Sequence, residues 1–357
     1  MLCDLRGRPE DGAFADGRSR SGLERRCRDA ELHAFGAGKE VRAAEVVGLL
    51  CCRPSMLAVT AELFRWSAAT LDDAGSQRLS CRSVDRSAEI NRASWDERAP
   101  AHAASPNYAR QQFIDDPSFV SAVARFDVPL LGDVRGLRGV HLQCHIGTDT
   151  ISLARHGATM TGVDFSPLSV AEARRLSDEL RAGVEFVEAD VYDAVAALGG
   201  RTFDLVFTGV GALCWLPSVS RWATVVAELL APGGRLFLRE GHPMLWSLDE
   251  RHADALVVEY DYFERPEPMV FDEQGTYVET DVQFQTTVTH VWNHGLGEIV
   301  TALLDVGMEL TGLVEHDSVP WEALPGQMEQ TAEREWRLRD RPWRLPHSYT
   351  LQAVKRS

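Results

Sequence analysis

The sequence has few of the features that mark membrane, secreted or metal-bound proteins. No uncharged apolar run approaches the roughly 20 residues that cross a bilayer. Asp4, Arg6 and Arg8 interrupt the basic-then-apolar order of a signal peptide. The seven cysteines form neither a CxxC pair nor a zinc-binding spacing with histidine. We therefore predict a soluble, cytoplasmic protein without a metal site, a membrane partner or a disulfide framework.

Basic charge is also scarce, and it is unevenly distributed. The 357 residues include 37 Lys+Arg and 53 Asp+Glu, which gives a formal net charge of −16. A general nucleic-acid binder needs a basic face to neutralise phosphates, so this balance argues against that class. Residues 1–89 contain 14 basic and 14 acidic side chains and five of the seven cysteines. The later residues therefore carry the whole net charge.

This composition break divides the chain into two parts. Residues 1–89 are rich in Arg, Ala, Gly and Ser, and Pro54 interrupts their one stretch compatible with a helix. We interpret them as an N-terminal extension that is either disordered or translated from a start assigned too early, with Met56 or Val84 as the true beginning. A regulatory or partner-binding extension is the other interpretation. Residues 90–357 are expected to hold the folded domain.

From residue 90 onward, helical and extended apolar patterns alternate. Helices are predicted at 90–104 and 117–131, before the first strand. Five strands then alternate with three helices, the strands at 139–144, 159–164, 184–189, 203–209 and 234–240 and the helices at 148–156, 167–182 and 217–230. This order is typical of a parallel sheet covered by helices on both faces.

The pattern becomes less regular after Glu240. Extended segments are predicted at 257–262 and 277–292, on either side of a turn-prone stretch at 265–275. A helix at 295–306 follows, for which Asn293 is the predicted N-cap. Strands are predicted at 308–316 and 346–354, with a Trp- and Arg-rich segment between them.

The first strand, its loop and the next helix have the order of a nucleotide-binding βαβ unit. Gly147 supplies a position without a Cβ where loop and ligand approach most closely. Thr148 and Asp149 are suited to cap the following helix and to hydrogen-bond a polar ligand group.

Two acids end the next two strands. Asp164 ends the second strand, 17 residues after Gly147, where a carboxylate can accept hydrogen bonds from both ribose hydroxyls. Asp190 ends the third strand, where it can accept from an adenine amino group. By spacing alone, these features fit either a dinucleotide or an adenosyl ligand.

A longer series of motifs resembles the class I S-adenosylmethionine-dependent methyltransferases that act on small molecules. The motifs are GVHLQCHIGTDT, GVDFS, VEADVYD, FDLVFTGVGAL and LLAPGGRLFLREGHP. The resemblance implies an α/β, Rossmann-like, seven-stranded and mostly parallel sheet with helices on both faces and one antiparallel strand. Within residues 90–357 it implies a helical lid at 90–135, a core at 136–245, a β-rich insertion at 246–294 and the C-terminal part of the core at 295–357.

The resemblance also implies the cofactor, S-adenosyl-L-methionine, and the residues that hold it. Asp164 would bind the ribose, Asp190 and Val191 the adenine, and the loop from Gln143 to Gly147 the methionine end. The other implied cofactor contacts are Tyr108, His145, Thr148, Asp149, Phe165, Ser166, Thr208 and Gly209.

The loop departs from the usual family pattern, acid-x-Gly-x-Gly-x-Gly. Here His141, Gln143 and His145 stand where an acid and two glycines are usual, and only Gly147 remains. We interpret this as a working variant in which Gln143 and His145 serve the methionine end. The alternative is a degenerate, inactive site.

Methyl transfer from a sulfonium is an in-line displacement in which the protein mainly positions the acceptor. An acceptor that loses a proton needs a base with a pKa near neutrality, which favours histidines at the carboxyl ends of strands. His242, just after the fifth strand, is the predicted base, with a structural hydrogen bond as the alternative. His145 and His294 are further catalytic candidates. Glu240 is either a cation ligand or a structural acceptor.

Aromatic side chains are predicted to wall the acceptor site. Trp215 follows the fourth strand, and the family's lid helix makes Trp95 a further candidate. Trp292 and His242 complete the predicted acceptor-binding set. For each aromatic residue, packing in the core is the alternative.

The acceptor class follows from what stands after the fourth strand. The [Asn/Asp/Ser]-Pro-Pro-aromatic motif of amino-methylating nucleic-acid enzymes is absent, and Thr208-Gly209-Val210-Gly211 stands there instead. With the acidity, this favours a small-molecule methyl acceptor and leaves O-, N- and C-methylation open. The oligomeric state, monomer or homodimer, is also left open.

Two other functions remain as alternatives. One is a nicotinamide-dependent oxidoreductase, disfavoured because the full Gly-x-Gly-x-x-Gly loop is absent, and the other is a non-catalytic cofactor-binding protein derived from a methyltransferase.

Overall fold

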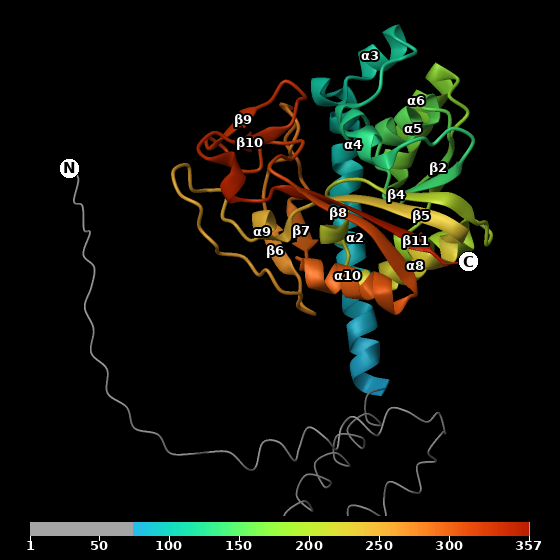
Figure 1. Ribbon diagram of the computed structural model, residues 1–357. Coiled ribbons are helices and arrows are strands. Elements are labelled where there is room, and N and C mark those ends of the chain that lie inside the picture. The colour runs from blue at the N-terminus through green and yellow to red at the C-terminus, as the bar shows by residue number, and fades with distance from the viewer. Residues whose placement is uncertain (1–73, 357) are drawn as a thin grey trace, which may run out of the picture. The chain divides into compact units, whose positions relative to one another are not determined.

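A seven-stranded sheet is the centre of the part of the chain that this computed structural model describes, residues 74–356 (Figure 1). The predictions for residues 1–73, including the break at Pro54 and a start at Met56, lie outside the described residues. The strand order is β3-β2-β1-β4-β5-β11-β8. The strands are β1 (Arg138–Leu142), β2 (Thr159–Asp164), β3 (Glu185–Glu188), β4 (Phe203–Thr208), β5 (Leu230–Gly241), β8 (Met308–His316) and β11 (Ser348–Lys355).

Only one of these seven strands runs against the others. β1 to β5 pair in parallel, whereas β11 is antiparallel to both of its neighbours, β5 and β8. The predicted Rossmann-like, mostly parallel sheet is therefore confirmed. Its strands lie within a few residues of their predicted bounds, because buried parallel strands are read from continuous apolar runs.

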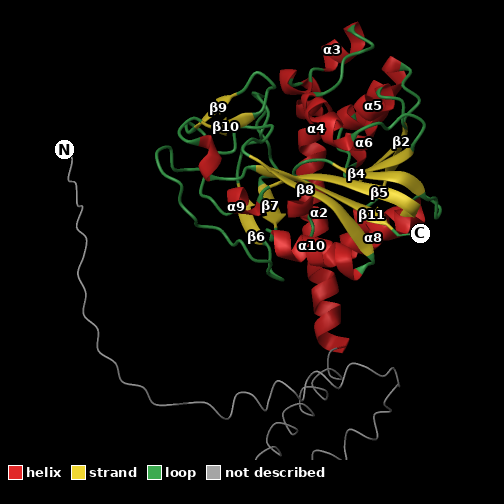
Figure 2. Cartoon of the chain, viewed as in Figure 1, coloured by secondary structure: helices red, strands yellow, loops and turns green. Residues whose placement is uncertain are grey.

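Helices cover both faces of the sheet (Figure 2). On one face, Leu131, Leu153 and Phe207 belong to an apolar layer under α4 (Ala122–Leu131) and α5 (Thr148–Arg155). On the other face, Trp222 and Leu303 pack under α8 (Val219–Leu229) and α10 (Leu296–Asp305). The remaining helices are α3 (Arg110–Asp115), α6 (Pro167–Leu180), α7 (Ala194–Ala197), α9 (Pro243–Trp246) and the short 3-10 turns η3 (Pro106–Tyr108), η4 (Val191–Asp193), η5 (Leu213–Trp215) and η6 (Pro342–Arg344).

The long helix α2 (Ala74–Ala104) precedes the sheet and crosses the boundary expected between residues 89 and 90. It is bonded to the segment 246–294, which we call the insertion. Asn91 exchanges two hydrogen bonds with the backbone of His290, at 2.8 and 2.9 Å. The Glu97 carboxylate accepts from Thr286 N–H at 2.7 Å, and Arg98 Nη1 donates to the Thr286 carbonyl at 2.8 Å. Helix α2 and the insertion are therefore one bonded assembly. None of the described helices is long and apolar enough to cross a membrane.

The insertion has less strand than its sequence predicts. Of the segment predicted at 277–292, only β7 (Val288–Val291) is a strand. Its antiparallel partner, β6 (Met269–Asp272), lies inside the stretch predicted to be a turn, and residues 257–262 form only an isolated bridge at Val258. A second small ladder, β9 (Met328–Gln330) with β10 (Trp336–Leu338), lies in the Trp- and Arg-rich segment. These strands exist because a partner lies beside them, which a single segment's composition does not encode.

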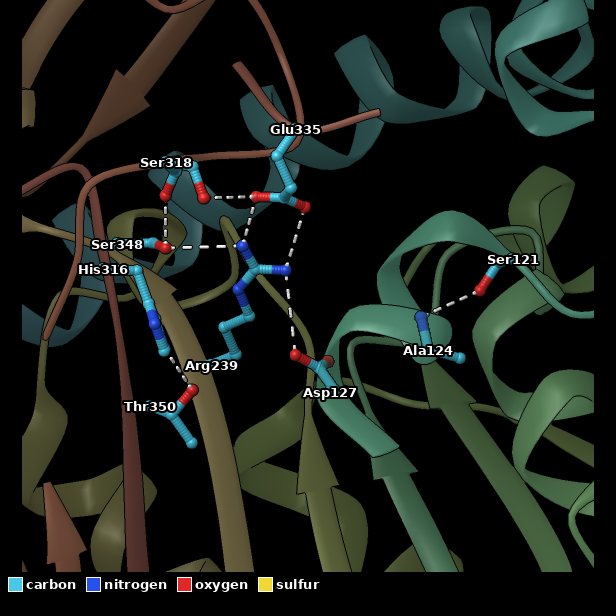
Figure 3. Close-up of polar contacts among 9 residues, drawn as sticks. All are labelled: Ser121, Ala124, Asp127, Arg239, His316, Ser318, Glu335, Ser348 and Thr350. Atoms are coloured by element: carbon cyan, nitrogen blue, oxygen red, sulfur yellow. Dashed lines mark hydrogen bonds and ion pairs between the residues drawn. The ribbon is translucent and has the colours of Figure 1, made fainter. Parts of the chain in front are cut away.

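A buried arginine joins three parts of the fold (Figure 3). Arg239, in β5, donates to the two oxygens of Glu335 at 3.3 and 2.6 Å and lies 3.7 Å from a carboxylate oxygen of Asp127 in α4. Its guanidinium also lies 3.7 Å from the centre of the Phe126 ring. All three charged side chains are at most 2% exposed. Burial raises the pKa of Asp127 to about 7, although Arg239 opposes this rise.

Removing Glu335 tests how strongly this network holds the fold. Glu335→Ala leaves Arg239 with too little compensating charge in a dry site, so we expect the free energy of unfolding to fall by about 3–5 kcal/mol. Chemical denaturation measures this loss. The control is Glu329→Ala, whose ion pair with Arg337 is 42–43% exposed and should contribute no more than about 1 kcal/mol. Equal losses in the two variants would contradict the prediction.

Candidate functional site

The loop between β1 and α5, residues 143–147, has the backbone of a glycine-rich loop with a single glycine. Gln143 and His145 have φ angles of +56° and +49°, and Gly147 has +79°. The left-handed region costs a non-glycine residue roughly 1–2 kcal/mol. The loop therefore keeps the shape that glycines would give it, and contacts elsewhere must stabilise that shape. We call this segment the cofactor loop.

Asp164, at the end of β2, supplies one of these contacts. Its Oδ2 accepts the backbone N–H of His145 at 2.8 Å, and its Oδ1 accepts that of Ser166 at 2.9 Å. The side chain is buried, which raises the pKa of Asp164 to about 6 against the lowering effect of these N–H groups. Each carboxylate oxygen can accept a second hydrogen bond. Asp164 therefore anchors the cofactor loop, and the predicted contact with a ribose remains compatible with this role.

Glu240, at the end of β5, holds a second loop, the one that follows β4. Its carboxylate accepts backbone N–H bonds from Gly211, Ala212 and Leu213 at 2.6–2.8 Å and from Gly241 at 2.7 Å. Glu240 is thus a structural acceptor rather than a cation ligand. It fixes the loop after β4, and Gln143 Nε2 joins the cofactor loop to that same loop by donating to the Ala212 carbonyl at 2.8 Å.

A cleft of about 150 Å³ opens between these two loops and the ends of β2 and β3. Six of the predicted site residues line it: Gln143, Phe165, Asp190, Val191, Trp215 and Trp292. The Asp190 Oδ1 caps η4 by accepting the Tyr192 N–H at 2.8 Å, and burial raises the pKa of Asp190. The guanidinium of Arg221 lies 3.9 Å from the centre of the Tyr192 ring. The cleft is therefore lined by aromatic and apolar groups together with charged ones, among them the carboxylates of Asp190 and Asp193.

Three of the twelve buried side-chain polar atoms that lack a hydrogen-bond partner in the described residues stand at the same edge of the sheet. They are His141 Nε2 and Gln143 Oε1, at the end of β1, and Thr208 Oγ1, at the end of β4. The other ring nitrogen of His141 is bonded to Thr150 Oγ1 at 2.8 Å, and burial lowers the pKa of His141 to about 3. Buried polar atoms are nearly always paired, so unpaired ones at the carboxyl ends of parallel strands indicate a polar ligand.

An aromatic cluster lies beside the cofactor loop, formed by Trp95, His102, Tyr108, His145, Trp215 and Tyr277. The ring centre of Trp95 is 5.0 Å from that of His145 and 5.2 Å from that of Trp215. The predicted Trp95, Tyr108 and Trp215 are thus together. His102 and Tyr277 were not predicted, although His102 follows Trp95 by seven residues and so lies on the same helix face. No sequence signal places Tyr277 of the insertion here.

His242, the predicted base, has a structural role instead. Its Nδ1 accepts the Met244 N–H at 3.0 Å as the N-cap of α9, and its Nε2 faces the Glu315 carboxylate at 3.0 Å. Both ring nitrogens are therefore engaged, and His242 does not line the cleft. The geometry argues against His242 as a base or as an acceptor-binding residue, because the motif located the turn but not the direction of its side chain.

Two N-cap predictions are corrected by the helix ends. Gly147, not Thr148 or Asp149, is the N-cap of α5, and Gly295, not Asn293, is the N-cap of α10. Asn293 instead donates to the Pro243 carbonyl at 2.8 Å.

His294 is buried and bridges the Leu216 carbonyl and the Glu298 carboxylate, at 2.7 and 2.8 Å. Because Leu216 lines the cleft and His294 does not, His294 supports the cleft wall without facing the cleft. Ser166 is the N-cap of α6, where its Oγ accepts the Ser169 N–H at 3.0 Å.

The described residues contain no group of three His, Cys, Asp or Glu side chains arranged to hold a metal ion. What the site offers is a βαβ loop, carboxylates at the ends of β2 and β3, and a cleft with a mixed apolar and polar lining. Residues 140–236 match a family model described as a methyltransferase domain. The chain contains a class I S-adenosylmethionine-dependent methyltransferase domain. This domain includes the cofactor loop, Asp164, Asp190 and most of β5.

Relatives of the methyltransferase domain include ubiquinone biosynthesis O-methyltransferases. That of Escherichia coli O7:K1 is 33% identical over 108 residues, and that of Xanthomonas oryzae pv. oryzae is 35% identical over 106 residues. Each match covers 30% of this chain and 43–44% of the relative, so the chain spans less than half the length of these relatives. A solved S-adenosylmethionine-dependent methyltransferase from Mesorhizobium loti is 22% identical, with 66% of this chain and 98% of that chain covered and a TM-score of 0.46.

The one glycine left in the cofactor loop of the methyltransferase domain provides a sharp test. A Cβ at Gly147 would lie 2.6 Å from the Phe186 ring and 2.9 Å from Ala173 Cβ. Gly147→Ala should therefore lower the free energy of unfolding by more than about 2 kcal/mol, through overpacking added to backbone strain. Gly183→Ala is the control, because its φ is +66° with nothing within 4 Å. Thermal denaturation should show the smaller loss in Gly183→Ala, and equal losses would refute the packing argument.

Proposed function

We propose that this protein binds S-adenosyl-L-methionine in the cleft and transfers its methyl group to a small-molecule acceptor. The observation that carries the proposal is the cofactor loop, which retains a glycine-type backbone at Gln143 and His145. A degenerate loop would have no reason to keep two strained residues. The strain is instead stabilised by Asp164 and by side-chain hydrogen bonds.

Four residues that line the cleft and three buried residues at neighbouring strand ends fit this cofactor part by part. Phe165 and Val191 offer apolar walls for an adenine, and Asp190 offers an acceptor for its amino group. Asp164 retains lone pairs for ribose hydroxyls. The unpaired polar atoms at His141, Gln143 and Thr208 would find partners in the amino and carboxylate groups of a methionine end. When bound, the cofactor supplies an activated methyl group on a sulfonium, and the protein's task is to orient the acceptor and exclude water.

The acceptor would lie under the lid and the insertion. We propose that residues 90–135 act as the lid and residues 246–294 as a roof, because Trp95 and Tyr108 come from the first and Tyr277 from the second. These rings, with Trp215, favour an apolar or aromatic small molecule. The O-methyltransferase relatives match only 30% of this chain, so their names support the reaction class more than the acceptor. The composition supports our further proposal of a cytoplasmic location, as a monomer or homodimer.

Calorimetric titration with S-adenosyl-L-methionine tests the assignment of the cleft. Asp164→Ala should abolish binding, because it removes the ribose acceptor and the anchor of the cofactor loop together. Phe165→Ala should weaken binding by about tenfold, the effect of about 1.4 kcal/mol of lost apolar contact, without removing any of the loop's hydrogen bonds. The control is Glu228→Gln on the exposed side of α8, which should bind like the wild type. Tighter binding of NADH than of S-adenosyl-L-methionine would contradict the assignment.

Methyl transfer itself is tested with a cofactor that carries an isotopically labelled methyl group. The protein is incubated with this cofactor and a small-molecule extract of its host, and products are followed by mass spectrometry. We expect the label in a product of low mass, and less of it with Phe165→Ala. Label confined to protein or nucleic acid would contradict a small-molecule acceptor.

A further inference from the structure

Two histidines far apart in the sequence share a hydrogen bond beside the cofactor loop. His102 Nδ1 in α2 lies 2.8 Å from His145 Nε2 in the loop. The second nitrogen of each ring is also engaged. His145 Nδ1 lies 3.1 Å from Ser169 Oγ in α6, and His102 Nε2 lies 2.7 Å from Thr276 Oγ1 in the insertion. One chain of hydrogen bonds thus runs from α6 through the cofactor loop and the lid helix to the insertion.

The hydrogen bond from His102 is made to a residue with a strained backbone, His145. His145 has a φ of +49°, and its backbone N–H is bonded to Asp164 while its ring is bonded to His102 and Ser169. A residue remains in this region only where surrounding contacts determine it. His102 is fully buried and reaches the cofactor loop only through the ring of His145. The shape of the loop therefore depends on where the lid helix lies.

The protonation state of the pair follows from its geometry. Two imidazoles that share one hydrogen bond need one donor and one acceptor, so at least one of the two facing nitrogens carries no proton. Burial lowers the pKa of His102 to about 3, with a further lowering from Arg98, and burial with the neighbouring His102 lowers that of His145. The titratable and charged groups around the pair are Arg98 on α2, Tyr108 on η3, Asp164 on β2 and Tyr277 on the insertion.

We propose that His102 and His145 form a latch that holds the cofactor loop in its binding shape when the lid helix and the insertion are closed. His102 is then a positioning residue for S-adenosyl-L-methionine, acting through His145. The inference rests on the proposed function. It also explains why histidine replaces glycine at residue 145, since a glycine would keep the backbone and the packing of Ile146 on Ala99 and Ala103 but lose the hydrogen bond to the lid helix.

The test compares His102→Ala with Asn91→Ala. Asn91 also ties α2 to the insertion, by two hydrogen bonds to the backbone of His290, but it does not touch the cofactor loop. We expect His102→Ala to weaken binding of S-adenosyl-L-methionine about tenfold or more and to speed its dissociation, measured by calorimetry and stopped-flow fluorescence. Asn91→Ala loosens α2 from the insertion but leaves the His102–His145 contact in place, so it should weaken binding less than His102→Ala does. His102→Gln should recover part of the loss, because an amide can still bond the His145 ring.

The pH profile separates a latch from a merely structural contact. Opening frees the two rings to take up protons, so the open state binds more protons below the ordinary histidine pKa of about 6.5. Closure is therefore favoured as pH rises, and wild-type affinity should be flat above pH ~7 and fall between pH ~6.5 and ~5.5, with a limiting slope of about tenfold per pH unit for each ring that takes up a proton. His102→Gln removes one of these rings, so its decline should be shallower. Identical affinity and pH profiles in His102→Ala, His102→Gln and the wild type would overturn the latch.

Hydrogen exchange of residues 143–147 tests the latch without cofactor. We expect faster exchange in His102→Ala and a smaller change in Asn91→Ala. Unchanged exchange in both variants would overturn the latch even if the protein binds the cofactor. A wild type that does not bind S-adenosyl-L-methionine, but whose loop exchange responds to His102→Ala, would overturn the proposed function and retain the link between lid and loop.

Discussion

The constraint on which this site depends is a loop that must adopt a left-handed backbone at residues that are not glycine. Gln143 and His145 lie in a region that side chains disfavour, in the loop that leads from β1 into α5. A glycine would adopt this shape without help. Two longer side chains adopt it only because each is bonded to another part of the fold, Gln143 to the loop after β4 and His145 to α6 and the lid helix.

Buried carboxylates provide the fixed points for those loops. Asp164 accepts two backbone N–H groups of the cofactor loop and of the turn after β2, whereas Glu240 accepts four from the loop after β4 and the end of β5. Arg239, next to Glu240 but on the other face of β5, ties α4 and the C-terminal segment to the sheet through Asp127 and Glu335. Charges in the core therefore hold together the segments that form the site. Most of these charged groups use their hydrogen bonds and ion pairs to fix the shape of the protein.

This arrangement changes how the histidines of the chain are understood. His242 and His294 occupy promising places in the sequence, yet both are engaged in structural hydrogen bonds. His102, which no motif distinguishes, reaches the cofactor loop from a helix that precedes the sheet. A histidine's chemistry depends on which groups its two ring nitrogens face. In the pairs His102–His145 and His242–Glu315, the partner comes from a segment more than 40 residues away.

The sequence alone was enough to predict the alternation of β1 to β5 with α5, α6 and α8, because buried parallel strands and amphipathic helices leave local apolar patterns. It was also enough to locate the cofactor loop and the acids at residues 164 and 190, which follow strands at short spacing. Only the tertiary structure decided that β6 forms within a turn-prone stretch, that Glu240 gathers four N–H groups, and that His102, His145 and Tyr277 meet. Each of these depends on a partner distant in the chain, and the pattern of one segment carries no record of the partner that folding brings beside it.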